Sequence, residues 1–486
     1  MSSSPGFEYD HLKSLEVSPL QRRLGGHPAL VFFIFAAAIA LTVLLLYSPK
    51  YFLGVLFISV ILGMTLVSPY AGILVTVAFL FLRPAERIPE LGALHFVRIQ
   101  EMLLICVWLL QRHLRRKKGF VRNPVLKVFA AGAVVIAASF TAAIWKPPVV
   151  SFLLFYLDAL LILIITVDLM NSESRLRNYL AVLLGAATFL SINQLFFTDR
   201  TADAMGVVRL SSIGTSLTDN NDFGLAMLFF LPFAFYLFLA SQKLIVRLGL
   251  LGMCVIFSAS VFASGSRGAI VGFIVMCTAI WFKAQNRVFA GIGLLLLLLT
   301  LWTFAPPTYK DYVYTIGNYQ QDTTATIRRK AWEVGVQLFL TRPLTGIGAT
   351  NYSAGYATVK GGSWRTAHSL YYQALTELGL LGIAWLVALV VVIIAATRRA
   401  QKRFLAAGYA RSLPAATANA IQVSLITFMT AGAFLSALYF PYFWLFGALT
   451  IVCEQAAKEL PEPGQVIPTT SDTFQLQTVG VPSQAN

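Results

Sequence analysis

The chain has 486 residues, of which 57% are hydrophobic and 12% are charged, and its mean hydropathy is +0.73. A soluble domain averages about 25% charged residues, so this composition excludes an ordinary soluble protein and predicts one that is embedded in a bilayer. The net charge of +16 does not indicate a nucleic-acid-binding protein, because the basic residues are spread over many short segments and not massed on one surface.

Apolar segments follow one another along most of the chain. Roughly 17–25 apolar residues in a helix cross the ~30 Å hydrocarbon core, so the sequence predicts an all-α integral membrane protein with about fourteen transmembrane helices. The predicted spans are 28–47, 51–67, 70–83, 96–111, 125–145, 149–170, 178–197, 222–240, 245–263, 268–282, 288–305, 369–396, 416–437 and 440–454. Two of them, 70–83 and 440–454, are short enough to be tilted or re-entrant.

The distribution of Lys and Arg predicts the orientation of the spans. Short loops rich in Lys and Arg stay in the cytoplasm, and the densest ones are 112–127 and 398–411. Both termini are therefore expected in the cytoplasm, as a polar tail at 1–27 and a disordered tail at 455–486. The first span lacks a small-residue cleavage site, so we interpret it as a retained helix.

The longest polar stretch, residues 306–368, separates the spans within 28–305 from those within 369–454. Up to residue 367 it holds seven Lys and Arg against three acidic residues. A long loop is translocated largely regardless of its charge, so we expect it outside. Charge kept at a membrane surface is costly and is often functional, so this loop is a candidate site of chemistry.

Within this loop, residues 327–340 have the periodicity of an amphipathic helix. At about 100° per residue, one face carries Ile327, Ala331, Val334, Gly335, Leu338 and Phe339. Arg329 and Glu333 form an i,i+4 pair on the opposite, solvated face. Arg328 lies at about 60° from the centre of the apolar face, beside Trp332, and an arginine there needs an anionic partner. No acid in the loop is an obvious partner, so Arg328 is a candidate for binding an anionic ligand.

Two further clusters fall between spans on the predicted outer side. The segment 208–223, VRLSSIGTSLTDNNDF, has Arg209 and then an Asp- and Asn-rich helix start from Asp219. Taken alone, such a helix start favours simple capping of free N–H groups. The turn 263–268, ASGSRG, holds Arg267 close to the membrane, with glycines that permit close backbone approach. The alternative for Arg267 is a side chain that only reaches the lipid headgroups.

His368 stands at the start of the longest apolar helix, where a neutral imidazole can accept a proton near pH 7. The alternative is a histidine that only caps or satisfies groups at the membrane surface. Glu377 is half a turn away from His368 on that helix, so we interpret it as a structural partner of another helix. Asp158 lies in the middle of a span, which favours either a proton or ion site or a buried pairing role.

Four pieces occur in order on the predicted outer side: SGSRG at 264–268, Arg328 with Trp332, RPLTGIGATNY at 342–352 and HSLYYQALTELGLLG at 368–382. Together they resemble the O-antigen ligase and Wzy polymerase superfamily of polytopic membrane glycosyltransferases. The resemblance covers about residues 200–400, and the first 200 residues match only as a run of spans.

The resemblance implies a C-type glycosyltransferase of the bacterial inner membrane, with 306–368 as a partly helical periplasmic loop that carries catalytic residues. The donor would be a glycan on undecaprenyl diphosphate and the acceptor a lipid, a polysaccharide or a protein, so ligase, polymerase and protein glycosylation all stay open. The family is taken to work without a metal or another cofactor. The implied roles are diphosphate binding by Arg209, Arg267 and Arg328, general base catalysis by His368, and substrate contacts by Trp332 and Tyr372.

A transporter or flippase of a lipid-linked glycan or an anionic solute is the alternative from another class. Many spans with an outer basic patch suit it, but it needs paired intramembrane charges and broken helices at the midplane. Asp158 alone is thin support, and one long loop on one side is poorly suited to alternating access.

Overall fold

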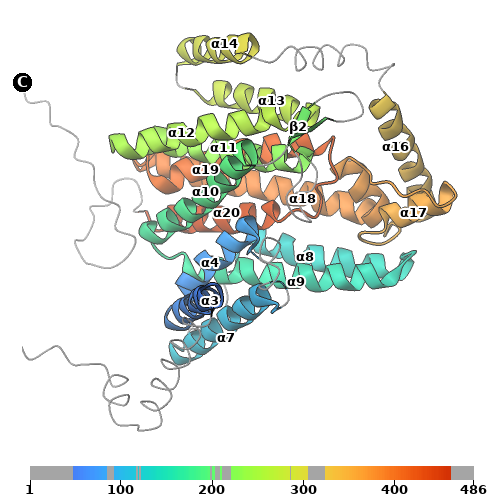
Figure 1. Cartoon of the computed structure of the whole chain (residues 1–486), viewed down its shortest axis with the longest axis horizontal. Coiled ribbons are helices and arrows are strands. Elements are labelled where there is room, and N and C mark those ends of the chain that lie inside the picture. The colour runs from blue at the N-terminus through green and yellow to red at the C-terminus, as the bar shows by residue number, and fades with distance from the viewer. Residues whose placement is uncertain are drawn as a thin grey trace, which may run out of the picture.

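The structure is a computed structural model, and it describes residues 48–84, 92, 94–116, 119, 122–197, 200–202, 208–210, 220–284, 286–304 and 323–460. These residues form a bundle of helices (Figure 1). In chain order the helices are α3 (Pro49–Val67), α4 (Pro69–Leu82), α7 (Phe96–Leu114), α8 (Pro124–Ser139), the 3-10 helix η1 (Phe140–Ala142), α9 (Lys146–Leu169), α10 (Glu173–Phe196), α11 (Asn220–Ala240), α12 (Leu244–Ala263), α13 (Arg267–Lys283), α14 (Arg287–Phe304), α16 (Thr323–Thr341), α17 (Tyr352–Val359), α18 (Leu370–Ala406), α19 (Leu413–Gly432) and α20 (Tyr442–Lys458). The predicted helical class is confirmed, with one short antiparallel hairpin of β1 (Arg200–Ala202) and β2 (Val208–Leu210) added.

Six helices in the described part of the chain are long and apolar enough to cross a membrane: residues 124–142, α9, α10, α11, α12 and α18. The protein is therefore a multi-pass membrane protein. The count of fourteen spans and the full outer loop remain predictions, because residues 28–47 and 305–322 lie outside the described residues. Both predicted tails, 1–27 and most of 455–486, also lie outside them.

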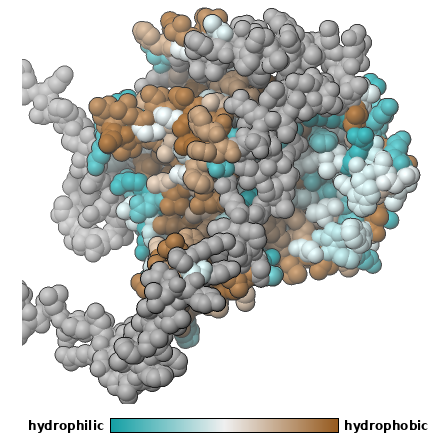
Figure 2. Space-filling model, in the orientation of Figure 1, coloured by the Kyte–Doolittle hydropathy of each residue, from teal (hydrophilic) through white to brown (hydrophobic). Residues whose placement is uncertain are grey.

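α11 lies at the centre of the bundle, where it packs against α12 and α19. Aromatic rings fill this centre. The ring centroid of Phe229 is 4.9 Å from that of Tyr442 and 4.8 Å from that of Phe446, both on α20. Hydrophobic side chains also cover much of the visible outer surface of the helices, and hydrophilic ones gather over α16 and α17 (Figure 2). An apolar outer surface is what helices in contact with lipid require.

Polar networks mark one end of the bundle. Arg112 Nη1 of α7 lies 3.1 Å from Asp168 Oδ1 of α9. The buried Glu454 of α20 accepts hydrogen bonds from Asn123 Nδ2 at 2.7 Å and from Arg399 Nη2 at 2.9 Å. We name this the basic end, because Arg112, Asn123 and Arg399 lie in the Lys- and Arg-rich segments that the sequence predicts to be cytoplasmic.

The opposite end of the bundle collects the helix termini and connections that carry the predicted outer clusters. Ile144, between η1 and α9, donates its N–H to Ile347 O at 3.0 Å, and His368 N–H donates to Ser436 Oγ at 2.8 Å. In Figure 1, α16 and α17 cover this end. We name it the site end.

The long helix α18 is interrupted at Gly379, whose φ of 66° and ψ of −155° are not helical. The segment that precedes α17 packs against the break. Leu380 N–H donates to Pro343 O at 2.9 Å, and Ile347 N–H donates to Thr376 O at 3.0 Å. Backbone groups freed by the break thus find partners in a loop of the site end, as buried backbone groups require.

Candidate functional site

His368 immediately precedes Ser369, the residue at the N-cap of α18. Its φ of 46° lies in the left-handed region, which is uncommon for a residue other than glycine and is found at functional sites. Its backbone N–H donates to Ser436 Oγ, and its ring Nε2 is 3.1 Å from Thr366 Oγ1. Hydrogen bonds therefore hold both the backbone of His368 and its half-buried ring.

Trp332 and Tyr372 join α16 to the start of α18. Their rings are stacked, with centroids 5.0 Å apart and planes 7° from parallel. Trp332 Nε1 donates to Ala367 O at 2.8 Å, one residue before His368. The structure thus brings both predicted aromatic residues beside His368. One face of the Trp332 ring lies against one face of the Tyr372 ring.

The predicted faces of α16 are confirmed. Ala331, Val334 and Leu338 are buried. Arg329 Nε is 3.6 Å from Glu333 Oε1, and these two side chains are 72% and 60% exposed. Arg328 is half-buried, so it lies between the two faces and within one helical turn of Trp332.

Arg267 is the first residue of α13, and it is half-buried. The turn before it is buried, and Ser266 Oγ accepts the N–H of Ala269 at 3.3 Å as an N-cap. A Cβ at Gly268 would stand 3.0 Å from Phe434 Cβ. The arginine turn therefore packs against the connection between α19 and α20, the same connection that holds His368 through Ser436.

Arg209 lies in the middle of β2, opposite Thr201 of β1. The hairpin lies toward the site end of the bundle in Figure 1. Asp219, the first residue of the predicted Asp- and Asn-rich helix start, lies outside the described residues. The helix predicted to follow it is α11, which begins at Asn220.

The RPLTGIGATNY segment connects α16 to α17 and clamps the turn between η1 and α9. Arg342 Nη1 donates to Ala142 O. Asn351, fully buried, accepts the N–H of Trp145 at 2.9 Å and donates through Nδ2 to Trp145 O at 3.0 Å. The motif therefore builds the site end through contacts with backbone groups, and its arginine is engaged with a carbonyl oxygen.

Glu377 is a buried structural partner, as its predicted position on α18 indicates. Its carboxylate accepts the N–H groups of Thr350 at 3.0 Å and Tyr352 at 2.8 Å, and the hydroxyl of Tyr439. Burial, and then the neighbouring carboxylate, raise the pKa of Tyr439 well above its ordinary value, so the phenol keeps its proton and donates it to this bond. Glu377 thus ties α17, α18 and the α19–α20 connection together.

The α19–α20 connection, residues 433–441, is a part of the site that the sequence does not predict. The predicted span 416–437 is wrong at its C-terminal end, because α19 ends at Gly432 and Ser436 lies in the connection. Residues 433–441 are nearly all apolar, so their pattern gives little sign of a loop. The best signal is Pro441, since proline is typical of a helix start.

Asp158 forms an ion pair with Arg98, and the two side chains are 27% and 64% exposed. Its Oδ2 lies 3.7 Å from Arg98 Nη1, which joins α9 to α7. The pair lies on helices that contribute neither His368 nor the arginine turn at Arg267.

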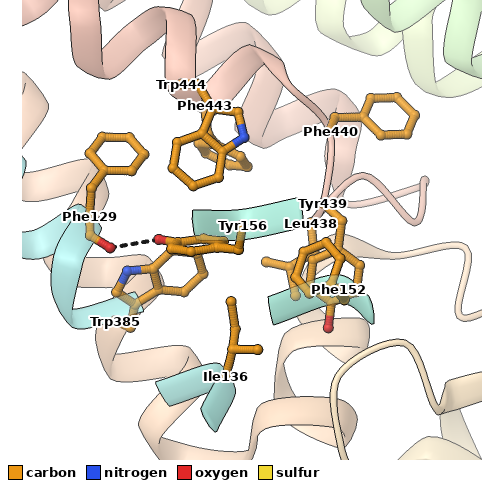
Figure 3. Close-up of a pocket in the computed structure, with 10 residues that line it drawn as sticks. All are labelled: Phe129, Ile136, Phe152, Tyr156, Trp385, Leu438, Tyr439, Phe440, Phe443 and Trp444. Atoms are coloured by element: carbon orange, nitrogen blue, oxygen red, sulfur yellow. Dashed lines mark hydrogen bonds between the residues drawn. The ribbon is translucent and has the colours of Figure 1, made fainter. Parts of the chain in front are cut away.

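An aromatic pocket lies among α8, α9, α18, α20 and the α19–α20 connection (Figure 3). It is lined by Phe129, Ile136, Phe152, Tyr156, Trp385, Leu438, Tyr439, Phe440, Phe443 and Trp444. Tyr156 donates its hydroxyl to Phe129 O at 2.8 Å. Tyr439 links pocket and site, because its ring lines the pocket and its hydroxyl bonds to Glu377. None of the described residues that line the pocket carries a carboxylate, imidazole or guanidinium group.

Residues 252–387 match the family model described as O-antigen ligase. The matched range contains Arg267, Arg328, Trp332, His368 and Tyr372, and it leaves out Arg209. No curated protein matches the chain. The family match confirms the predicted resemblance and implies an enzyme of the membrane glycosyltransferase type.

Proposed function

We propose that this chain, a member of the O-antigen ligase and Wzy polymerase superfamily, moves a glycan from undecaprenyl diphosphate to an acceptor hydroxyl. The reaction takes place on the periplasmic face of the bacterial inner membrane, and the acceptor is a lipid, a polysaccharide or a protein. The observation that carries the proposal is the position of His368 at the site end, held in a left-handed conformation beside Trp332 and Tyr372.

The arginines bind the donor diphosphate in this proposal. Arg267 and His368 both border the α19–α20 connection, through Gly268 against Phe434 and through Ser436. Arg328 lies on α16 one turn before Trp332, whose indole N–H bonds to Ala367 O next to His368. Guanidinium groups bind phosphate oxygens bidentately and stay charged, so they suit a diphosphate that gains charge as it leaves. Arg209 on β2 is the third diphosphate-binding residue.

His368 acts as the general base. It takes the proton of the acceptor hydroxyl while that oxygen attacks the anomeric carbon of the donor sugar. The bond between the anomeric carbon and the phosphate oxygen breaks on the opposite side, and undecaprenyl diphosphate leaves with the bonding electrons. The product has an inverted anomeric centre, and the proton passes from His368 to water.

Glycan transfer is distinguished from glycan transport by the formation of a new glycosidic bond to the acceptor. Purified protein is incorporated into liposomes with an undecaprenyl-diphosphate-linked glycan, and lipid, polysaccharide and peptide acceptors are added in separate samples. We expect the glycan on one acceptor and free undecaprenyl diphosphate in equal amounts. Movement of intact lipid-linked glycan between leaflets, with no new glycosidic bond, would contradict the proposal and favour the flippase alternative.

A further inference from the structure

The α19–α20 connection contacts His368 through Ser436. Ser436 Oγ accepts the backbone N–H of His368 at 2.8 Å. His368 has a left-handed backbone, and such a conformation is strained and persists only where the surroundings impose it. The hydrogen bond from Ser436 is one direct contact of this kind, and it comes from outside the helix that follows His368.

Ser436 is itself held from two sides. Toward the C-terminus, Leu438 N–H donates to Gln373 Oε1 at 3.3 Å, and Tyr439 donates its hydroxyl to Glu377. Toward the N-terminus, Phe434 packs against Gly268, the residue after Arg267. The connection therefore fixes Ser436 relative to α18 and to the arginine turn at once.

A second hydroxyl holds the ring of His368. Thr366 Oγ1 is 3.1 Å from Nε2. The residue between them, Ala367, is fixed by its carbonyl oxygen, which accepts the indole N–H of Trp332. Thr366 is thus attached to a short, anchored piece of chain, so its hydroxyl can select one orientation of the imidazole.

We propose that Ser436 and Thr366 are positioning residues for His368, Ser436 setting its backbone and Thr366 its ring. This inference rests on the proposed function, in which His368 is the general base. Displacement of a catalytic group by about 1 Å can lower a rate about 100-fold without changing substrate binding. Loss of either hydroxyl should therefore lower kcat and leave donor affinity intact.

The first test compares removal of each hydroxyl with its conservative replacement. Ser436→Ala and Thr366→Val should lower kcat about 10- to 100-fold with an unchanged KM for the lipid-linked donor, because phosphate contacts stay in place. Ser436→Thr and Thr366→Ser keep an oxygen at each position and should recover most of the rate. Thr430→Ala is the matched control, since Thr430 Oγ1 bonds to Ile426 O within α19 and its loss should not change kcat.

The second test is a double-mutant cycle with His368. In the His368→Ala background, Ser436→Ala and Thr366→Val should cause no further loss, because no imidazole remains to be positioned. An equal loss with and without His368 would overturn the inference while leaving the proposed function in place, whereas a native protein without transfer activity would refute the function itself. If Ser436→Ala fails to fold, the Thr366 pair decides the question, because Thr366 is exposed and lies outside the connection.

Discussion

The buried carboxylate of Glu377 accepts the backbone N–H of Tyr352 at 2.8 Å, across the gap between α18 and α17. The N–H of Thr350 and the hydroxyl of Tyr439 bond to the same carboxylate. Three segments that are far apart in the sequence are thus held by one side chain, at the same end of the bundle as the residues that carry the proposed chemistry.

We expect Glu377→Ala to destabilise the protein strongly. It leaves the buried N–H of Tyr352 without this partner, and a buried unpaired group costs about 1–3 kcal/mol. The midpoint of thermal unfolding, followed by tryptophan fluorescence in detergent, should fall. Glu333→Ala is the control, because its exposed pair with Arg329 contributes only about 0.3–0.5 kcal/mol. Equal unfolding midpoints for both variants would contradict a stabilising role of the Glu377 carboxylate.

A substitution at Gly346 tests how closely the connection between α16 and α17 packs against the break in α18. Its φ is 69°, and a Cβ there would overlap the backbone of Glu377. Gly361 has a similar φ of 61°, and no atom lies within 4 Å of the position that a Cβ would take there. Gly361→Ala should therefore show only the left-handed strain of about 1–2 kcal/mol, and Gly346→Ala should be clearly less stable than that. Equal unfolding midpoints would show that packing at Gly346 does not matter.

The outward and inward faces of α16 could be predicted because they depend on periodicity within one short segment. Ala331 and Leu338 are buried and Arg329 is exposed, as the pattern indicates. Such a pattern states which side of a helix is covered. It does not state what covers it, so the stacking of Trp332 on Tyr372 could not be derived from the same residues.

Two features of the site depend on partners distant in the sequence, and these could not be predicted. The break at Gly379 forms because residues 343–347 bond to the freed backbone, while the local sequence is apolar and continues like a helix. The connection that carries Ser436 is likewise apolar, so its composition extends the preceding predicted span into it, as far as residue 437. In both cases a tertiary contact decides the backbone.

The arginines of α16 should not be equivalent. We expect Arg328→Ala to abolish glycan transfer and Arg329→Ala to be mild, because only Arg328 lies near the covered side of the helix. Loss of a bidentate phosphate contact should cost several kcal/mol, against about 0.3–0.5 kcal/mol for an exposed i,i+4 pair. Arg328→Lys should also be poor, since a point charge cannot replace the fork. Transfer rates at equal membrane levels are the measurement, and equal rates in both alanine variants would contradict the argument.

Reporter fusions test the orientation of the two ends. Fusions within 112–122 and 398–411, at the basic end, should report the cytoplasm, and fusions within 350–365, at the site end, should report the periplasm. A cytoplasmic signal near Gly362 would place the site on the wrong face for a glycan that is used in the periplasm.

Substitution of His368 distinguishes a role in catalysis from a role in donor binding. We expect His368→Ala to bind the undecaprenyl-diphosphate donor normally, because the phosphate contacts come from arginines, while single-turnover transfer falls about 10²–10⁴-fold. Only the neutral imidazole can accept a proton, so the native rate should rise with pH as His368 loses its proton and then level off. The His368→Ala variant should be slow and lack this step, whereas Arg267→Ala should lose donor affinity as well as rate. His113→Ala on α7, at the basic end, is the matched control and should behave like the native protein. If His368→Ala lost donor binding but kept the native rate at saturating donor, His368 would be a substrate contact, and the base would have to be another group of the site end.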